Sequence, residues 1–329
     1  MIGAEKGRRA LLMLMAAIAA EPTLRAQPAR KSPRIGLLLP DVEMMPERRA
    51  AMEALHEGLR ELGWIDGKTL TIETRLAGFD PQRQREVAAQ LKALPVALII
   101  AVGTITIRAA RDGAPGVPIV MVNAGDPVGA GLAVSLARPG GDLTGTSAAG
   151  EEVLAKQLEL LSAAVPHFKR VGLLMNTANP ANHFFFDAVA GRAKPLGLQL
   201  DRIEVGADSS LEAAIGRARG GALIVVGDPM FHRQRVRIIE AALRARVPAM
   251  FGGRDYVADG GLMSYLSDYR WHWHSAAGYV DKILKGVKPG EIPIAQPTRF
   301  ELIINLKTAR ALGVTIPQSL ILRADEVIQ

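Results

Sequence analysis

The stretch Arg-Ile-Gly-Leu-Leu-Leu-Pro at residues 34–40 returns as Arg-Val-Gly-Leu-Leu-Met-Asn at residues 170–176. Each copy is a near-continuous apolar run, which is typical of a parallel strand buried on both faces. A second echo follows in the same order, because Ala97–Gly103 corresponds to Ala222–Gly227, and each of these runs leads into a polar turn and a helical stretch. The repetition predicts two similar α/β lobes in tandem.

Strand-like and helix-like segments alternate along the chain. Further apolar runs lie at residues 70–74 and 118–122, and helical periodicity lies at residues 47–63 and 81–94. Helix starts are indicated by Asp80 before a proline, and by Ser209 with Glu212 three residues later, which is the spacing of a capping box. The alternation predicts a doubly wound parallel sheet in each lobe, so that both lobes are Rossmann-like.

The chain after Phe251 contains too little for a third lobe. Two strand candidates remain, Gly261–Tyr265 and Phe300–Ile304, and they must complete the existing sheets. The simplest arrangement has three crossings between the lobes, which forms a hinge that permits closure over a cleft. The crossings are expected near residues 146–151, 259–261 and 293–299. The first lobe is then expected to comprise residues 33–148 and 261–293, and the second lobe residues 149–260 and 294–329.

The N-terminus has the order of a secretory signal peptide. Lys6, Arg8 and Arg9 precede an apolar run over residues 10–20, and we place cleavage after Ala26, so that the leader is residues 1–26. The run is shorter than the roughly 20 residues that a membrane-spanning helix needs, and the chain has no cysteine for a lipid anchor or a disulfide. We expect an unanchored monomer in the periplasm of a Gram-negative cell.

Composition and motifs argue against several classes of function. The formal net charge is +7, but basic and acidic residues are interspersed, which does not favour nucleic-acid binding. The sequence has no Gly-x-Ser-x-Gly elbow, no Gly-x-x-x-x-Gly-Lys phosphate loop, no Gly-x-Gly-x-x-Gly after the first strand and no His-Glu-x-x-His. Only His272 and His274 are close, and on a helix they point about 200° apart. We expect no catalytic residue, no cofactor and no metal site.

Ligands of open parallel sheets bind beyond the carboxyl ends of the strands. Gly103 lets backbone amides approach an anion, and Thr104 offers a hydroxyl, although a threonine there is also an ordinary helix cap. Asp126 and Asp228 each precede a proline, where a carboxylate either pairs with a ligand ammonium or only starts a turn. The two readings stay open for each of these positions.

The loop after the first strand of the second lobe is also polar. Asn176 and Asn179 both donate and accept hydrogen bonds, which suits a polar ligand or a plain turn. Three phenylalanines follow at residues 184–186 and cannot all face the core, so one walls the cleft or they pack within and between the lobes. The expected ligand-binding residues are Pro40, Asp41, Gly103, Thr104, Ile105, Asn123, Asp126, Asn176, Asn179, Asp228 and Tyr265.

Several longer motifs resemble one family of transport proteins. They are Gly125–Leu132, Ala137–Gly145, Gly260–Tyr265, Tyr279–Gly286, Phe300–Ala309 and Ile316–Ile328. In this order, over residues 33–329, the chain resembles the ABC transporter substrate-binding protein family related to TrpX. The resemblance implies a type I periplasmic-binding-protein fold, with two lobes joined by three crossovers. It also implies that a small polar ligand is captured in the interlobe cleft and delivered to an inner-membrane permease and its ATPase.

The resemblance further implies an amino-acid ligand, which is aromatic in the relatives that are understood. Matching positions place the contacts at Gly103, Thr104, Asp126, Asn176, Asn179 and Asp228. The chain departs from the family at Ile105-Thr106, where Pro-Ala or a similar small pair is usual. It also departs at Met175 and Thr177, where Trp and Pro are common. These departures bear on the identity of the ligand and leave the fold untouched.

Two other functions remain open from the sequence. A ligand-binding subunit presented to a periplasmic sensor would have the same leader and fold. An exported α/β enzyme would need a nucleophile, an acid and a base in the cleft. The only candidates for these roles are the carboxylates Asp41, Asp126 and Asp228. The missing catalytic motifs favour a binding protein over an enzyme. The family resemblance favours transport, and the sensor subunit stays open as an alternative.

Overall fold

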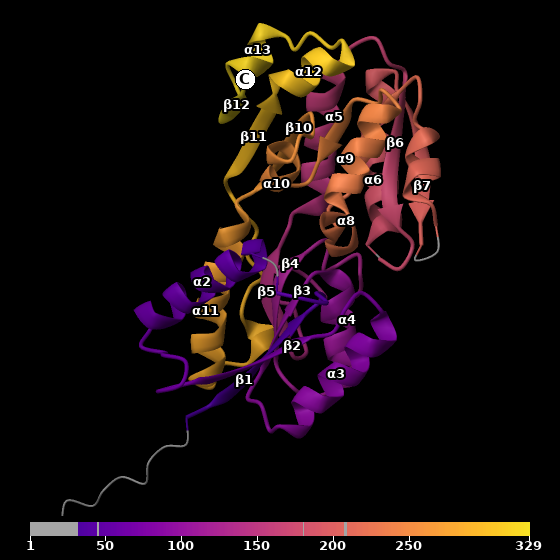
Figure 1. Cartoon of the computed structure of the whole chain (residues 1–329). Coiled ribbons are helices and arrows are strands. Elements are labelled where there is room, and N and C mark those ends of the chain that lie inside the picture. Colours follow the sequence, from indigo (N-terminus) through magenta and orange to yellow (C-terminus); the bar gives the residue numbers. More distant parts are fainter. Residues whose placement is uncertain (1–31, 45, 180, 207–208) are drawn as a thin grey trace, which may run out of the picture. The chain divides into compact units, whose positions relative to one another are not determined.

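The computed structural model describes residues 32–44, 46–179, 181–206 and 209–329. The expected signal peptide at residues 1–26 lies outside the described residues. Within the described ranges the strands form two sheets, and we call each sheet with its helices a lobe (Figure 1). In these same ranges, no helix combines the length and the apolar character needed to cross a bilayer.

The sheet of the first lobe has the order β2-β1-β3-β4-β5, and its pairs are parallel in the described residues. Its strands are β1 (Arg34–Leu39), β2 (Thr71–Leu76), β3 (Ile99–Val102), β4 (Ile119–Ala124) and β5 (Leu143–Ser147). Leu37 packs with α2 (Pro46–Glu61) and α11 (Tyr269–Leu284), whereas Leu38 packs with α3 (Pro81–Ala93) and α4 (Thr104–Gly113). The two helix pairs therefore cover opposite faces of the sheet (Figure 1).

The sheet of the second lobe has the order β12-β11-β10-β9-β8-β6-β7. Its strands are β6 (Arg170–Asn176), β7 (Gln199–Val205), β8 (Ala222–Val225), β9 (Ala249–Phe251), β10 (Met263–Ser267), β11 (Phe300–Asn305) and β12 (Glu326–Ile328). One face is covered by α5 (Gly150–Ala164), α6 (Asn182–Ala193), α12 (Leu306–Leu312) and α13 (Gln318–Ile321). The other is covered by α7 (Leu211–Gly216), α8 (Pro229–Arg233), α9 (Arg235–Arg244) and α10 (Arg254–Ala258). Two 3-10 helices are η1 (Lys194–Leu196) and η2 (Pro289–Glu291).

The tandem repeat predicted from the sequence is confirmed. Strand β1 pairs with β2 and β3, and β6 pairs in the same way with β7 and β8. The two echoed stretches thus occupy equivalent positions in their sheets. The second sheet differs in one respect, because β11 runs antiparallel to β10. Strand β11 returns from the first lobe and does not follow a helix that lies on its own sheet, so the parallel direction that βαβ units impose does not apply to it.

The second crossing lies later in the chain than the sequence analysis placed it. Strand β10 pairs with β9 and β11, so it belongs to the second lobe, and the crossing falls between β10 and α11. The sequence analysis assigned residues 261–293 to the first lobe, and the beginning of that range is therefore wrong. The glycines at 260 and 261 form a tight turn between α10 and β10, in which Gly261 N–H donates to the Tyr256 carbonyl at 2.7 Å.

Two further local expectations are wrong. Ser210, and not Ser209, caps α7, because the Ser210 hydroxyl accepts from the Ala213 amide at 3.2 Å. The Ser209 hydroxyl accepts instead from the Gly206 amide, in the preceding turn. The sequence analysis also expected two strands after Phe251 and missed the short edge strand β12, which pairs with β11. The start of α3 is confirmed, because Asp80 accepts from two amides of its first turn.

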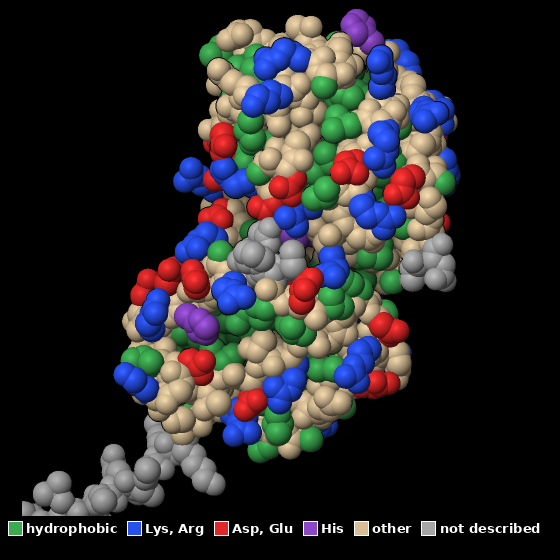
Figure 2. Space-filling view, in the orientation of Figure 1, with side chains coloured by type: hydrophobic (Ala, Val, Ile, Leu, Met, Phe, Trp, Pro, Cys, Tyr) green, Lys and Arg blue, Asp and Glu red, His purple; other side chains and the backbone are tan. Residues whose placement is uncertain are grey.

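Charged side chains of both signs are distributed over the surface. Figure 2 shows blue and red side chains interspersed over both lobes on the face in view. Several form local pairs, such as Arg170 with Asp201 at 2.6 Å and Arg235 with Asp259 at 2.7 Å. On this face the described side chains therefore carry mixed charge and do not form a continuous basic track.

A buried histidine connects two of the three crossings. His272 of α11 is fully buried, and its Nδ1 lies 3.0 Å from the Thr146 hydroxyl at the end of β5. Its Nε2 lies 2.9 Å from the Ser267 hydroxyl at the end of β10. The Thr146 hydroxyl also accepts from the Asn123 amide at 3.1 Å. One imidazole thus links the ends of β5 and β10, the two strands that lead into the first and the second crossing.

This histidine gives a testable pH dependence of stability. Burial lowers the pKa of His272 to about 4 from the usual 6.5, so the unfolded chain binds a proton between these values that the folded protein does not bind. The free energy of unfolding should therefore decrease as the pH falls from about 6.5 towards 4, by about 2–3 kcal/mol through this group alone.

Urea denaturation at pH 7 and pH 4.5 measures this dependence. The free energy of unfolding is expected to differ less between the two pH values in the His272→Gln protein than in the wild type, by the amount stated above. His274→Gln is the matched control, since His274 lies on the same helix, is half-exposed and pairs with Glu61 at 3.2 Å. Equal pH dependence in the His272→Gln protein and the wild type would rule out His272 as its source.

Candidate ligand-binding site

A small cavity lies between the two lobes at the carboxyl ends of their strands. The space open to the centre of a water molecule is about 20 Å³, which is enough for about one water. A cavity of this size does not hold a molecule as large as an amino acid. The cavity is lined by Pro40, Phe79, Gln84, Val102, Gly103, Thr104, Ile105, Thr106, Asn176, Asn179, Asp228, Pro229 and Met230.

Asp228 is the charged residue of this cavity, and it is almost fully buried. The Asn176 and Asn179 side-chain amides each donate to one of its oxygens at 3.1 Å. The Met230 amide donates at 2.9 Å, because Asp228 caps the start of α8. Burial raises the pKa of Asp228, and these three hydrogen bonds oppose the increase. All three partners are neutral, so none of them supplies a positive charge to balance the ionised form of the carboxyl group.

The two asparagines are held so that they can only donate to Asp228. The Asn176 side-chain oxygen accepts from the Ala178 amide at 3.0 Å, and the Asn179 side-chain oxygen accepts from the Ala181 amide at 3.1 Å. Each oxygen is therefore used within the loop that follows β6, and each nitrogen faces Asp228. The loop thus prepares a rigid polar wall in the second lobe.

The first lobe contributes the start of α4 to the opposite wall. Gly103 precedes the helix with φ 78° and ψ 153°, a conformation that glycine adopts almost alone. Among the described residues, no side chain caps this helix start. The Thr104 hydroxyl accepts from the Gly125 amide at 3.0 Å, so Thr104 does not serve as the helix cap. The uncapped amides of the first turn carry the partial positive charge of the helix and favour an anion.

The structure brings seven of the expected ligand-binding residues to this cavity. They are Pro40, Gly103, Thr104, Ile105, Asn176, Asn179 and Asp228. Their elements come from both lobes, and each residue follows or ends a parallel strand, as the rule for open sheets requires. The cavity thus collects residues that lie up to about 190 positions apart in the sequence. They meet because the crossover connections of parallel strands bring the carboxyl ends of those strands to the same edge of each sheet.

The other four expected residues lie outside this cavity. Asp41 pairs with Arg48 at 2.8 Å. Asn123 has a φ of 56°, and its amide donates to Thr146. The Asp126 carboxylate accepts from the amides of the two residues at 128 and 129, at 3.1 and 3.0 Å, which is the turn chemistry left open above. Tyr265 stacks on Phe300 with ring centroids 5.6 Å apart. The side chains of Asp41, Asp126 and Tyr265 are thus used by their own lobes, whereas the buried side-chain oxygen of Asn123 has no hydrogen-bond partner within the described residues.

Arg48 explains why Asp41 is withdrawn from the cavity. Its guanidinium donates to Asp41 and to the Tyr269 hydroxyl. It also lies over the Tyr269 and Trp273 rings, at 5.7 and 5.4 Å from their centroids. Such a cation–π contact is stronger when the cation is desolvated. Asp41 therefore balances a buried cation that anchors α2 on α11.

The phenylalanines at 184–186 do not line the cavity. Phe185 is buried in the core of the second lobe, and its ring end lies 2.5 Å from where a Cβ at Gly150 would be. It would also lie 2.8 Å from a Cβ at Gly125. Phe185 thus packs tightly beside the first crossing. Phe186 packs partly buried against the same core, so the expected core packing holds for Phe185 and Phe186, whereas Phe184 is 44% exposed.

The sequence analysis missed several lining residues, of which Phe79 and Gln84 are the most informative. Phe79 belongs to the loop after β2, a post-strand loop that the search of the first lobe did not include. Gln84 lies in the first turn of α3 and is 1% exposed. Together with Val87, Ala88 and Leu91 it forms the buried stripe of that helix. A glutamine at an apolar position of the helical period is the signal that could have found it.

An ion pair crosses between the lobes near the cavity. Arg233 of α8 donates to Glu43, in the loop after β1, at 3.0 Å. Both side chains are more than one third exposed, so solvent screens their attraction and the pair contributes little to the stability of the closed arrangement.

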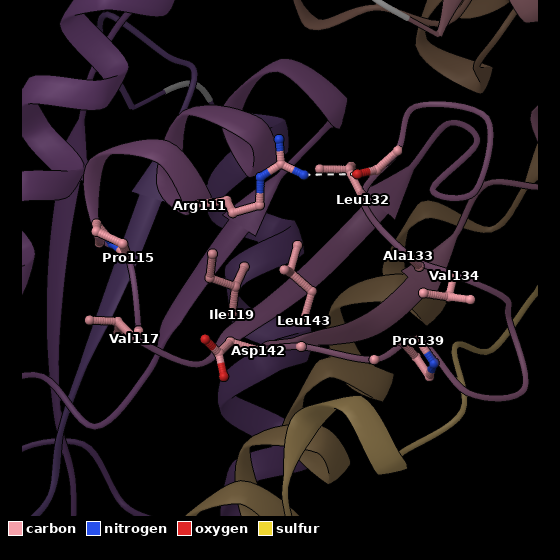
Figure 3. Close-up of a pocket in the computed structure, with 15 residues that line it drawn as sticks. Arg111, Pro115, Val117, Ile119, Leu132, Ala133, Val134, Pro139, Asp142 and Leu143 are labelled. Atoms are coloured by element: carbon pink, nitrogen blue, oxygen red, sulfur yellow. Dashed lines mark hydrogen bonds between the residues drawn. The ribbon is translucent and has the colours of Figure 1, made fainter.

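A larger cavity of about 440 Å³ lies elsewhere in the first lobe (Figure 3). It is lined by Ile119 and Leu143, at the beginnings of β4 and β5, and by loops that include Arg111 and Asp142. Figure 3 shows these side chains around the cavity. Ligands of parallel sheets bind at the opposite ends of the strands, and none of the expected ligand-binding residues lines this cavity. Its size alone does not make it the functional site.

Comparisons with known proteins agree with the two-lobed reading. A tyrosine-binding protein of Clostridioides difficile (strain R20291) is 27% identical over 271 residues, which are 82% of this chain and 78% of that protein. A conserved domain protein from Vibrio cholerae O1 biovar El Tor superposes with a TM-score of 0.82 and 26% identity, covering 90% of this chain and 100% of that chain.

The fold is shown further by the ABC domain in complex with L-Trp from Streptococcus pneumonia. It superposes with a TM-score of 0.83 and 24% identity, over 90% of this chain and 100% of that chain. The two lobes therefore have the type I periplasmic-binding-protein fold that the resemblance implied. The profile of the family described as "ABC transporter substrate binding protein" matches residues 42–328. The chain is thus a substrate-binding protein and not an enzyme, and it belongs to the ABC transporter substrate-binding protein family.

Proposed function

We propose that this protein is the extracytoplasmic receptor of an ABC importer and that it captures an amino acid with an aromatic side chain between its lobes. The observation that carries the proposal is the buried Asp228 carboxylate, whose hydrogen-bond partners are all neutral. It faces the same cavity as the uncapped start of α4. A negative wall and a positive wall on opposite lobes suit the two charged groups of an amino acid.

The ligand ammonium pairs with Asp228, and the ligand carboxylate accepts from the first-turn amides of α4. A charged hydrogen bond to the ammonium replaces the water that Asp228 loses on burial. The carboxylate is stabilised by the partial positive charge of the helix start. Because one ligand holds both walls, it binds the closed arrangement of the lobes better than the open one and shifts the population towards closure.

Two relatives support an aromatic amino acid. The similar protein of Clostridioides difficile is a tyrosine-binding protein, and the similar structure from Streptococcus pneumonia contains L-Trp. The cavity of this chain adds its own support, because Phe79 and Pro40 provide an apolar wall beside the polar groups. An apolar wall with a few convergent polar groups is the usual composition of a small-molecule site.

The family description supports delivery of the ligand to a transporter, and the leader, the location and the monomeric state are part of our proposal. The receptor is exported through the leader at residues 1–26, releases its ligand to an inner-membrane permease with an ATPase, and works as a monomer in the periplasm. The permease would recognise the surfaces that closure brings together. The pair between Glu43 and Arg233 joins such surfaces, since the two residues come from different lobes.

Thermal denaturation with each of the twenty amino acids tests the proposed ligand. An aromatic amino acid at 100 times its Kd is expected to raise the Tm by about 4 °C, because only the native state binds it. Calorimetry is expected to give one ligand per chain, and mass spectrometry to recover the ligand unchanged. A chain that binds no amino acid, or that converts the bound compound, would disprove the proposal.

A further inference from the structure

Gln84 has a side-chain oxygen that is buried without a partner. The residue is 1% exposed, and its Oε1 has no hydrogen bond within the described part of the chain. Gln84 lines the interlobe cavity together with Phe79 and Thr106. Nearly all buried polar atoms in proteins are hydrogen-bonded, so an unpaired one beside a ligand cavity indicates a partner that the ligand supplies.

The orientation of this amide is fixed by its surroundings. The Gln84 nitrogen donates to the Gly78 carbonyl at 2.6 Å. A flipped amide would point its oxygen at that carbonyl, and two acceptors repel each other. Asp80 holds the intervening turn, because its carboxylate accepts from the amides of Gln82 and Arg83. The hydrogen-bonding atom that Gln84 still has to offer at the cavity is therefore an acceptor, held in place, and not a donor.

The acceptor belongs to a different element from the proposed partners of the ligand's two charged groups. Asp228, on the second lobe, is the proposed partner of the ammonium, and the start of α4 is the proposed partner of the carboxylate. Gln84 and Phe79 come from a third place, α3 and the loop before it, and Phe79 contributes an aromatic ring to the same cavity. A ring that packs on Phe79 would bring its polar edge to Gln84.

We propose that Gln84 determines specificity by accepting a hydrogen bond from an O–H or N–H on the aromatic side chain of the ligand. The inference rests on the proposed function and goes beyond it. It states that the receptor selects tyrosine or tryptophan and rejects phenylalanine, whose ring has no donor. A buried acceptor left unpaired by phenylalanine is expected to weaken its binding at least about tenfold relative to the matching donor.

Calorimetry with paired ligands tests this inference in the wild-type protein without any variant. Tyrosine is compared with phenylalanine, and tryptophan with 3-benzothienylalanine, in which sulfur replaces the indole N–H. At least one donor ligand is expected to bind about tenfold or more tightly than its partner. Equal affinities within both pairs would overturn the role of Gln84. Failure of every aromatic amino acid to bind would instead disprove the proposed function, so the two failures are distinguishable.

Gln84→Met then assigns the selectivity to this residue. Methionine has a similar length and no acceptor oxygen of this kind, so the affinity ratio within the selective pair is expected to fall to about one. Gln82→Met is the matched control, because Gln82 lies in the same helical turn and is exposed. It is expected to keep the wild-type ratio. A Gln84→Met protein that still binds ligand with the wild-type ratio would contradict the inference.

Discussion

Asp228→Asn is expected to weaken ligand binding at least about 100-fold, because truncating one side of a buried charge pair leaves the ligand ammonium without its counter-charge. The substitution keeps the shape of the side chain and an oxygen that can accept from the Asn176 and Met230 nitrogens. It removes the charge alone. Calorimetry with the ligand found by thermal denaturation measures the effect.

The same substitution should hardly change the stability of the ligand-free protein. An asparagine at 228 turns an amide nitrogen towards the donating nitrogen of Asn179, which costs about one hydrogen bond, on the order of 1 kcal/mol. The neutral side chain also relieves the burial of an unbalanced charge, which offsets this loss. Urea denaturation without ligand is expected to give a free energy of unfolding within about 1 kcal/mol of the wild type.

Asp126→Asn is the matched control. Asp126 also precedes a proline and was expected at the site, but its carboxylate caps a turn in the first lobe. Its substitution is expected to leave the affinity unchanged. Equal affinity losses in the two variants would contradict the assignment of the ammonium to Asp228.

The pH dependence of binding gives a second measurement on Asp228. Burial raises the pKa of this carboxyl group above its ordinary value of 3.8. Binding of an ammonium needs the carboxylate, so affinity is full above that raised pKa and is lost as the pH falls through it. The Asp228→Asn protein is expected to lack this acid limb.

Gly103→Val is expected to keep the lobes apart and to weaken binding by about 10- to 100-fold, which corresponds to the cost of overpacking a closed interface. A Cβ at position 103 would lie 3.4 Å from Cγ of Pro229 on the second lobe. The two methyl groups of valine extend beyond that Cβ and would overlap Pro229 when the lobes close. The overlap disappears when the lobes move apart.

Small-angle X-ray scattering measures the closure directly. The radius of gyration of the wild type is expected to decrease on addition of ligand, and that of the Gly103→Val protein to stay constant. Gly116→Val controls for backbone strain, because Gly116 has the same φ of 78° and open space around it. If the Gly116→Val protein also failed to close, strain and not contact with Pro229 would be the cause.

The repeat made the fold predictable, because the apolar runs of both lobes are local features that need no partner to be recognised. The crossing after β10 was misplaced for the opposite reason. Whether the strand at 263–267 joins one sheet or the other depends on its pairing with β9 and β11, which are distant from each other in the sequence. Periodicity reports that a strand exists, and it does not report its neighbours.

The site was also predictable only as far as local sequence features reach. Asp126 and Asp228 look alike in the sequence, since each follows a strand and precedes a proline. Only the folded chain brings Asn176 and Asn179 to one of them and leaves the other to cap a turn. Gln84 was missed although its position in the helical period matches the buried stripe of α3. A polar residue in the first turn of a helix is usually interpreted as exposed to solvent.

The first lobe is completed by a helix that the ribosome makes late. Trp273 of α11 is fully buried among residues of β1, α2 and β4, yet more than a hundred residues of the second lobe are synthesised before it. No contiguous fragment of the gene therefore encodes the first lobe with its core. Exchanging one lobe between relatives requires three splices, and a nascent chain cannot finish folding its first lobe until most of the second has been translated.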